Sequence, residues 1–129
     1  MRFGAFAAVT IGNIVLATPV HAESRAAYVT MVLGAFATKV QCPGTDVVYQ
    51  DLLQKANEMH LPEGTTEKVR KAIAYMHTAG KMGERGDDEL MSEVAMATRS
   101  IDLDQRRLGM ASWCETEKTQ LAGLVRTNK

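Results

Sequence analysis

Two cysteines far apart in the chain constrain its fold more than any other feature. Cys42 and Cys114 are the only cysteines among 129 residues, and both follow an apolar N-terminal stretch. In an oxidising compartment such a pair most simply forms one disulfide. Closing so long a loop stabilises a small domain by about 4 kcal/mol in the chain-entropy model. We therefore predict a Cys42–Cys114 disulfide. A redox-active pair is disfavoured, because the sequence has no C-x-x-C motif.

The N-terminal stretch has the features of a cleavable secretory signal peptide, residues 1–22. Arg2 gives it a positive start, an apolar run follows from Phe3 to Leu16, and Val20-His21-Ala22 offers a cleavage site before Glu23. The alternative is an uncleaved anchor helix. It is disfavoured because the apolar run is shorter than the roughly 20 residues that a membrane span needs. We expect a mature domain, residues 23–129, with no stable membrane insertion.

The mature chain is predicted to be a single all-α domain. Apolar residues recur at helical spacing along it, and no strand-like alternation of useful length is present. We predict a small helical bundle of about five helices linked by one disulfide, with helices over residues 24–40, 45–60, 65–80, 87–101 and 102–126.

The first of these helices is apolar on nearly every side. Ala26, Val29, Leu33, Phe36 and Val40 share one face, and further apolar residues occupy the others. A helix of this kind is normally buried on several sides. We expect it to be the central helix of the bundle. A subunit interface, and hence a homodimer, is the alternative.

The expected helix boundaries follow from capping chemistry. Proline and glycine at positions 43 and 44 should end the first helix. We predict N-caps at Thr45, at Thr65 or Thr66, at Asp87 or Asp88, and at Asp102. The last helix should bury a seam formed by Leu103, Met110, Cys114, Leu121 and Leu124.

Charge and motifs exclude several classes of function. The formal net charge is +0, which disfavours binding to nucleic acid or to an anionic membrane. The sequence contains no G-x-S-x-G, no H-E-x-x-H and no Gly-rich phosphate loop. We therefore predict no catalytic residue and no cofactor, and we expect the protein not to be an enzyme.

Histidine and methionine suggest one alternative, a copper carrier. His60 and His77 each follow a methionine, Met59 and Met76, and soft sulfur with imidazole suits copper. Both methionines also fall on the expected core faces, where methionine fills gaps. The core interpretation is favoured, and we predict no metal site.

Residues 81–86 form the longest expected loop and the most mobile segment. Three glycines at positions 80, 83 and 86 surround four residues that could meet a partner: Lys81, Met82, Glu84 and Arg85. We single these four out as a possible interaction loop.

The leading functional hypothesis is a small non-enzymatic binding protein of the periplasm, with full secretion as the alternative. Its partner would be another envelope or secreted protein, as for an inhibitor or an immunity-type factor. Two further hypotheses remain open. One is an acid- or stress-responsive periplasmic chaperone that exposes the apolar first helix, and the other is a carrier of a metal or a small ligand.

Overall fold

The computed structural model describes residues 20–128, with side chains from Ser24 onward. Five α-helices and two short strands follow one another in this part of the chain: α2 (Val20–Gln41), β1 (Thr45–Val47), α3 (Tyr49–Glu58), α4 (Thr65–His77), α5 (Asp88–Leu108), α6 (Met110–Gln120) and β2 (Val125–Thr127). The prediction of a small all-α bundle is confirmed. The predicted signal peptide, 1–22, lies outside the described residues except for its last three, which begin α2, and it stays a prediction.

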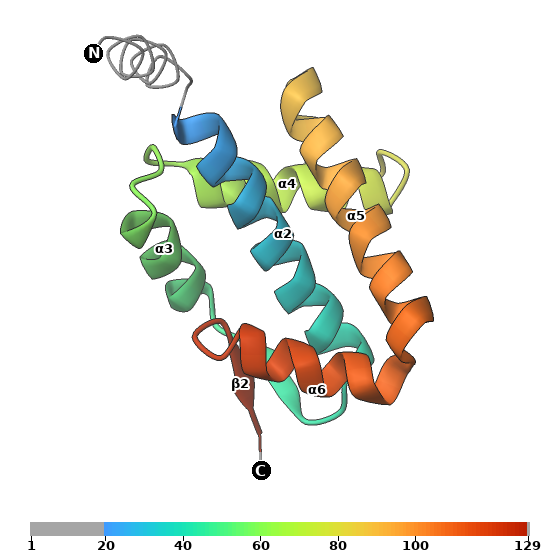
Figure 1. Cartoon of the computed structure of the whole chain (residues 1–129). Coiled ribbons are helices and arrows are strands. Elements are labelled where there is room, and N and C mark those ends of the chain that lie inside the picture. The colour runs from blue at the N-terminus through green and yellow to red at the C-terminus, as the bar shows by residue number, and fades with distance from the viewer. Residues whose placement is uncertain (1–19, 129) are drawn as a thin grey trace, which may run out of the picture.

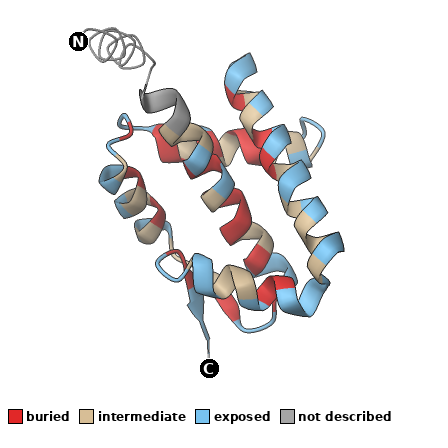
Figure 2. Cartoon of the chain, viewed as in Figure 1, coloured by how far each residue is buried: buried red, intermediate tan, exposed pale blue. Residues whose placement is uncertain are grey.

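Helix α2 is the centre of the bundle, as its apolar sequence predicted. It runs through the middle of the molecule between α3 and α5, with α4 crossing near one of its ends and α6 near the other (Figure 1). Its buried residues lie in the interior of the bundle (Figure 2). They pack against apolar stripes of the other helices to form one core: Tyr28, Val29, Val32, Leu33, Leu52, Ala56, Val69, Ala72, Ile73, Leu90, Val94 and Ala97.

The predicted disulfide is present. Cys42, directly after α2, bonds to Cys114 in α6, with 5.8 Å between their Cα atoms. The two cysteines and Trp113, which is 1% exposed, form a second small apolar cluster, against which Ala37 of α2 and Ile101 of α5 pack. The disulfide therefore joins the end of the central helix to the helix that closes the bundle.

The predicted last helix, 102–126, is wrong in its boundaries. Helix α5 continues through Asp102 to Leu108 and ends at Gly109, which has a φ of 83°. Asp102 is therefore not an N-cap, and Leu103 and Met110 are 53% and 43% exposed instead of buried. A straight helix would have carried the following residues away from the core. The turn at Gly109 brings Cys114 back to Cys42.

The two strands were missed by the sequence prediction. β1 and β2 form an antiparallel pair with Thr45 opposite Thr127 and Val47 opposite Val125. Three residues per strand are too few for an alternating pattern to be recognised. Thr45 is therefore not an N-cap. Its hydroxyl oxygen lies 3.0 and 2.8 Å from the carbonyl oxygens of Thr38 and Cys42 at the end of α2.

The other two predicted caps have different outcomes. The carboxylate of Asp87 accepts a hydrogen bond from the Leu90 amide at 2.8 Å, which confirms it as the N-cap of α5. The N-cap position of α4 is Gly64, so the prediction of Thr65 or Thr66 is wrong. Thr66 is buried instead, and its hydroxyl shares a 2.7 Å hydrogen bond with the hydroxyl of Tyr28.

Candidate functional site

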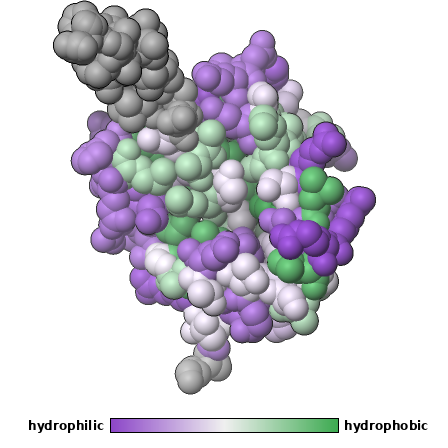
Figure 3. All heavy atoms as spheres, viewed as in Figure 1, coloured by the Kyte–Doolittle hydropathy of each residue, from purple (hydrophilic) through white to green (hydrophobic). Residues whose placement is uncertain are grey.

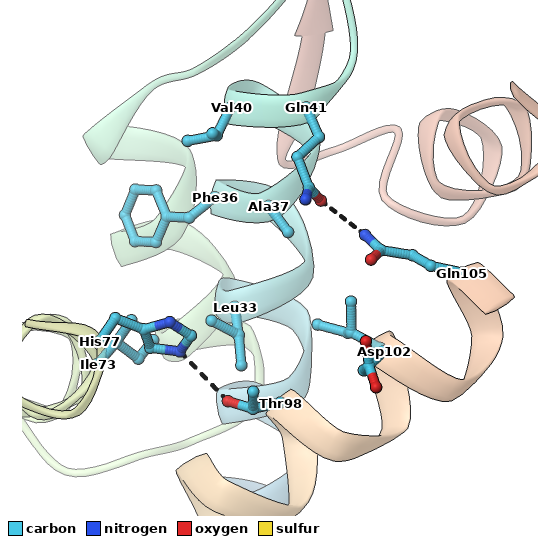
Figure 4. A pocket seen from close by; sticks show the side chains of 11 residues that line it. Leu33, Phe36, Ala37, Val40, Gln41, Ile73, His77, Thr98, Asp102 and Gln105 are labelled. Carbon is cyan, nitrogen blue, oxygen red and sulfur yellow. Dashed lines mark hydrogen bonds between the residues drawn. The ribbon is translucent and has the colours of Figure 1, made fainter. Parts of the chain in front are cut away.

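An apolar groove of about 410 Å³ lies along the C-terminal half of α2. Figure 4 shows α2 as its floor, α5 as one wall and the last turn of α4 as part of the other. Eleven residues line it: Leu33, Phe36, Ala37, Val40, Gln41, Ile73, His77, Thr98, Ile101, Asp102 and Gln105. Such a concave, mostly apolar site with a few polar groups is the type of place where proteins bind ligands and partner segments.

The groove exists because α2 is apolar on more sides than the bundle covers. Phe36 is only partly buried, and Val40 is 82% exposed at the open edge, so the apolar face that the sequence predicts does not stay in the core as far as Val40. Ala37 has only a methyl side chain, so it leaves space above the floor of the groove. On the face shown in Figure 3, hydrophobic residues also gather along the middle of the molecule and on the C-terminal half of α5, with hydrophilic residues at the edges.

His77 supplies a polar group at one end of the groove. Its Nε2 lies 3.2 Å from the hydroxyl oxygen of Thr98. That hydroxyl already donates its hydrogen to the carbonyl oxygen of Val94 at 2.8 Å, so it must accept from His77. In its neutral form the imidazole therefore carries its proton on Nε2. Its Nδ1 is left as a hydrogen-bond acceptor, on the side turned toward Phe36 (Figure 4).

The opposite end of the groove is closed by two glutamines. Gln105 of α5 donates a 2.6 Å hydrogen bond to Gln41 of α2. Asp102, one turn before Gln105, pairs with Arg106 at 2.9 Å on the exposed surface. Asp102 is the only aspartate, glutamate, lysine or arginine among the residues that line the groove.

The disulfide cluster supports the floor and one wall of the groove. Ala37 and Ile101 each line the groove and also pack against the cluster of Cys42, Trp113 and Cys114. Trp113 is the only tryptophan of the chain. An occupant that moves either residue would therefore change the surroundings of Trp113, whose fluorescence can report on occupancy.

The predicted interaction loop is exposed but anchored to α4. The Glu84 amide donates to the carbonyl oxygen of Lys71 at 3.1 Å, and the side chains of these two residues pair at 3.6 Å. The Met82 amide donates to the Thr78 hydroxyl at 2.9 Å. Arg85 pairs with Asp88 at 2.7 Å. Lys81 and Met82 stay exposed, and the role of all four residues as a partner surface stays a prediction.

The two histidines of the copper hypothesis lie on different elements. His60 follows α3 with a φ of 58°, and His77 ends α4. Among the side chains of residues 24–128, no three from His, Cys, Asp or Glu are grouped so that they could hold a metal ion.

A half-buried carboxylate lies where α6 meets α2. The Glu117 side chain approaches Gly34 so closely that a methyl group there would lie 2.9 Å from Oε1. Burial, together with the nearby negative charge of Asp104, raises the pKa of Glu117 above its ordinary value. The charged form is therefore disfavoured in the folded state.

An ion-pair cluster holds the other ends of α2 and α5 together. Arg25 donates from Nε to Glu93 at 2.8 Å, and its Nη2 lies 3.4 and 3.8 Å from carboxylate oxygens of Glu89 and Asp87. The adjacent pocket of about 240 Å³ is lined by charged groups of both signs. Because carboxylates of the chain already surround Arg25, this cluster has a structural explanation.

Comparisons with known proteins gave no match to a family model, to a curated protein or to a solved structure. Among the described residues, no helix is both long and apolar enough to span a membrane.

Proposed function

We propose that this protein is a small non-enzymatic binding domain of the periplasm that takes an apolar segment of another envelope or secreted protein into the groove on α2. The observation that carries the proposal is the groove itself. Its floor belongs to the central helix, and Val40 and Phe36 leave apolar surface open to solvent. Inhibition or neutralisation of a secreted protein is the kind of activity that such binding would serve.

The proposed location rests on the disulfide and on the predicted signal peptide. Disulfides persist in oxidising compartments such as the periplasm and are rare in the cytosol. The Cys42–Cys114 bond supports both the floor and one wall of the groove. Binding should therefore depend on the oxidised form.

A carrier of a small apolar ligand is the second candidate function. The groove volume of about 410 Å³ falls within the range of roughly 300–1,000 Å³ seen for small-molecule sites. A carrier purified from its native source should release a small organic compound on denaturation, detectable by mass spectrometry. A protein-binding domain should not.

The experiment that tests the proposal is a quantitative pull-down from native envelope extract with the oxidised domain as bait. Ala37→Leu fills the floor of the groove, and Val40→Ser removes an apolar side chain without touching the core. Matched controls are Ala27→Leu, on an exposed position of the same helix, and Leu103→Ser, on an exposed position of α5 outside the groove.

Capture of one partner at fixed stoichiometry, lost with both groove variants and kept with both controls, is the expected result. Equal capture by all four variants would show that the groove is not the binding site. Capture of many unrelated proteins, above all after an acid step, would indicate the chaperone instead.

A further inference from the structure

We infer that the occupant of the groove is an amphipathic helix that carries a lysine or arginine beside its apolar face. This inference rests on the proposed function and names the chemistry of the partner segment. It follows from three features of the groove: its length, its shape and the position of its hydrogen-bond acceptors.

The length of the groove matches two turns of a helix. Its floor extends from Leu33 to Gln41 and its wall from Thr98 to Gln105. At 1.5 Å per residue these segments rise about 12 Å and 10 Å. Apolar side chains at positions i, i+3, i+4 and i+7 of a docked helix span about 10 Å, and this is the usual pattern for helices bound in grooves.

The shape of the groove also suits a helix. Its walls and floor come from helices, and the small side chain of Ala37 lies in the floor beside the larger Phe36, one turn after Leu33 (Figure 4). A small residue at such a position allows two helices to approach closely, with the ridges of one fitting the grooves of the other. Val40 at the open edge would cover the flank of the docked helix.

The polar groups of the groove favour a cationic donor. The carboxylate of Asp102 is an acceptor on one side, and Nδ1 of the neutral form of His77 is an acceptor on the other (Figure 4). The ion pair of Asp102 with Arg106 is exposed and therefore weak, so an incoming ammonium or guanidinium group can share this carboxylate. An anionic amphiphile such as a fatty acid would instead meet the negative charge of Asp102.

A second copy of the chain is the competing occupant. Lys39 lies next to its exposed Val40, and the pair of Lys39 with Asp46 at 3.4 Å is exposed like that of Asp102 with Arg106. Sedimentation equilibrium separates the two occupants. A dimer of the wild-type domain that is lost in Ala37→Leu would assign the groove to self-association and overturn the inference.

The direct test uses two synthetic peptides, each about four helical turns long. Both have leucine at i, i+3, i+4 and i+7 in an alanine background. One has lysines flanking the leucines and the other has glutamates in their place. Binding to the oxidised domain is followed by the anisotropy of a dye on the peptide and by the fluorescence of Trp113.

The expected result is that the lysine peptide binds at least about tenfold more tightly than the glutamate peptide. Asp102→Asn should weaken binding of the lysine peptide about three- to fivefold, the size of an exposed ion pair. Glu58→Gln, which removes a carboxylate that pairs with Lys55 on the distant α3, should leave binding unchanged.

Other outcomes separate the inference from the proposed function. Equal binding of both peptides, abolished by Ala37→Leu and Val40→Ser, would refute the cationic partner and leave the groove as the binding site. Binding that survives both groove variants would refute the proposed function as well. If neither peptide binds at about 1 mM, the limit of very weak affinity, the helical occupant is wrong.

Discussion

Glu117 is a residue whose ionisation opposes the fold. Burial raises its pKa, so the folded state binds its proton more tightly than the unfolded state does. The stability gained from the protonated form is fully present below the ordinary glutamate pKa and is lost as the pH rises through the raised value. Above that raised value the protein carries a half-buried charge that it would be more stable without.

We predict that Glu117→Gln stabilises the protein at pH 7 and has little effect at pH 3. Glutamine keeps the shape of the side chain and removes the charge. The midpoint of thermal unfolding, measured for both proteins across this pH range, should diverge as the pH rises. A constant difference at all pH values would mean that charge burial is not the cause.

Gly83 is a second residue at which a small change should affect stability, because even one added methyl group has no space there. Its φ is 74°, and a methyl group there would collide with the carbonyl oxygen of Lys71. Gly64 has a similar φ of 89° but open space around it. Gly83→Ala should cost about 3 kcal/mol or more, and Gly64→Ala only about 1–2 kcal/mol of backbone strain. Equal costs in urea unfolding would show that the loop is not held against α4.

At the scale of elements, the disulfide fixes how α6 closes the bundle. It joins residues 72 positions apart. Replacing both cysteines by serine should lower the free energy of unfolding by about 2–5 kcal/mol and change the fluorescence of Trp113. An unchanged unfolding midpoint would show that packing alone holds α6 in place.

The sequence predicted most of the helices because their apolar faces repeat with helical spacing. Val69, Ala72 and Ile73 in α4, and Leu90 and Val94 in α5, are buried as their spacing indicates. The helix start predicted at Asp102 was wrong, because an acidic residue before an apolar one resembles an N-cap even in the middle of a helix. The residue that could have indicated the end of α5 is Gly109, because glycine commonly ends helices. Its φ of 83° and ψ of 153° are accessible almost only to glycine.

The groove was not predictable in the same way. The sequence shows that α2 is apolar on nearly every side, but not which of those sides the other helices leave uncovered. Val40 continues the stripe of Leu33 and Phe36, yet it is exposed, because α6 and β1 contact other sides of that end of α2. The tautomer of His77 depends on Thr98, twenty-one residues away, and such a contact has no local pattern.

At the scale of the whole molecule, the helices leave one face of the central helix α2 open as a groove, and we propose that a partner binds there. The disulfide cluster supports that face through Ala37 and Ile101. The anchored loop at residues 81–85 is the competing surface, since it is exposed and carries charged side chains. The two surfaces involve different residues, so a residue-level measurement can separate them.

The most direct measurement is the change in backbone amide NMR shifts when the ¹⁵N-labelled oxidised domain is titrated with the captured partner. We predict the largest changes at residues 33–41 and 98–105 and at His77, with little change at residues 81–85. Large changes confined to residues 81–85, with the groove residues unaffected, would contradict the claim that this protein binds its partner through the groove on α2.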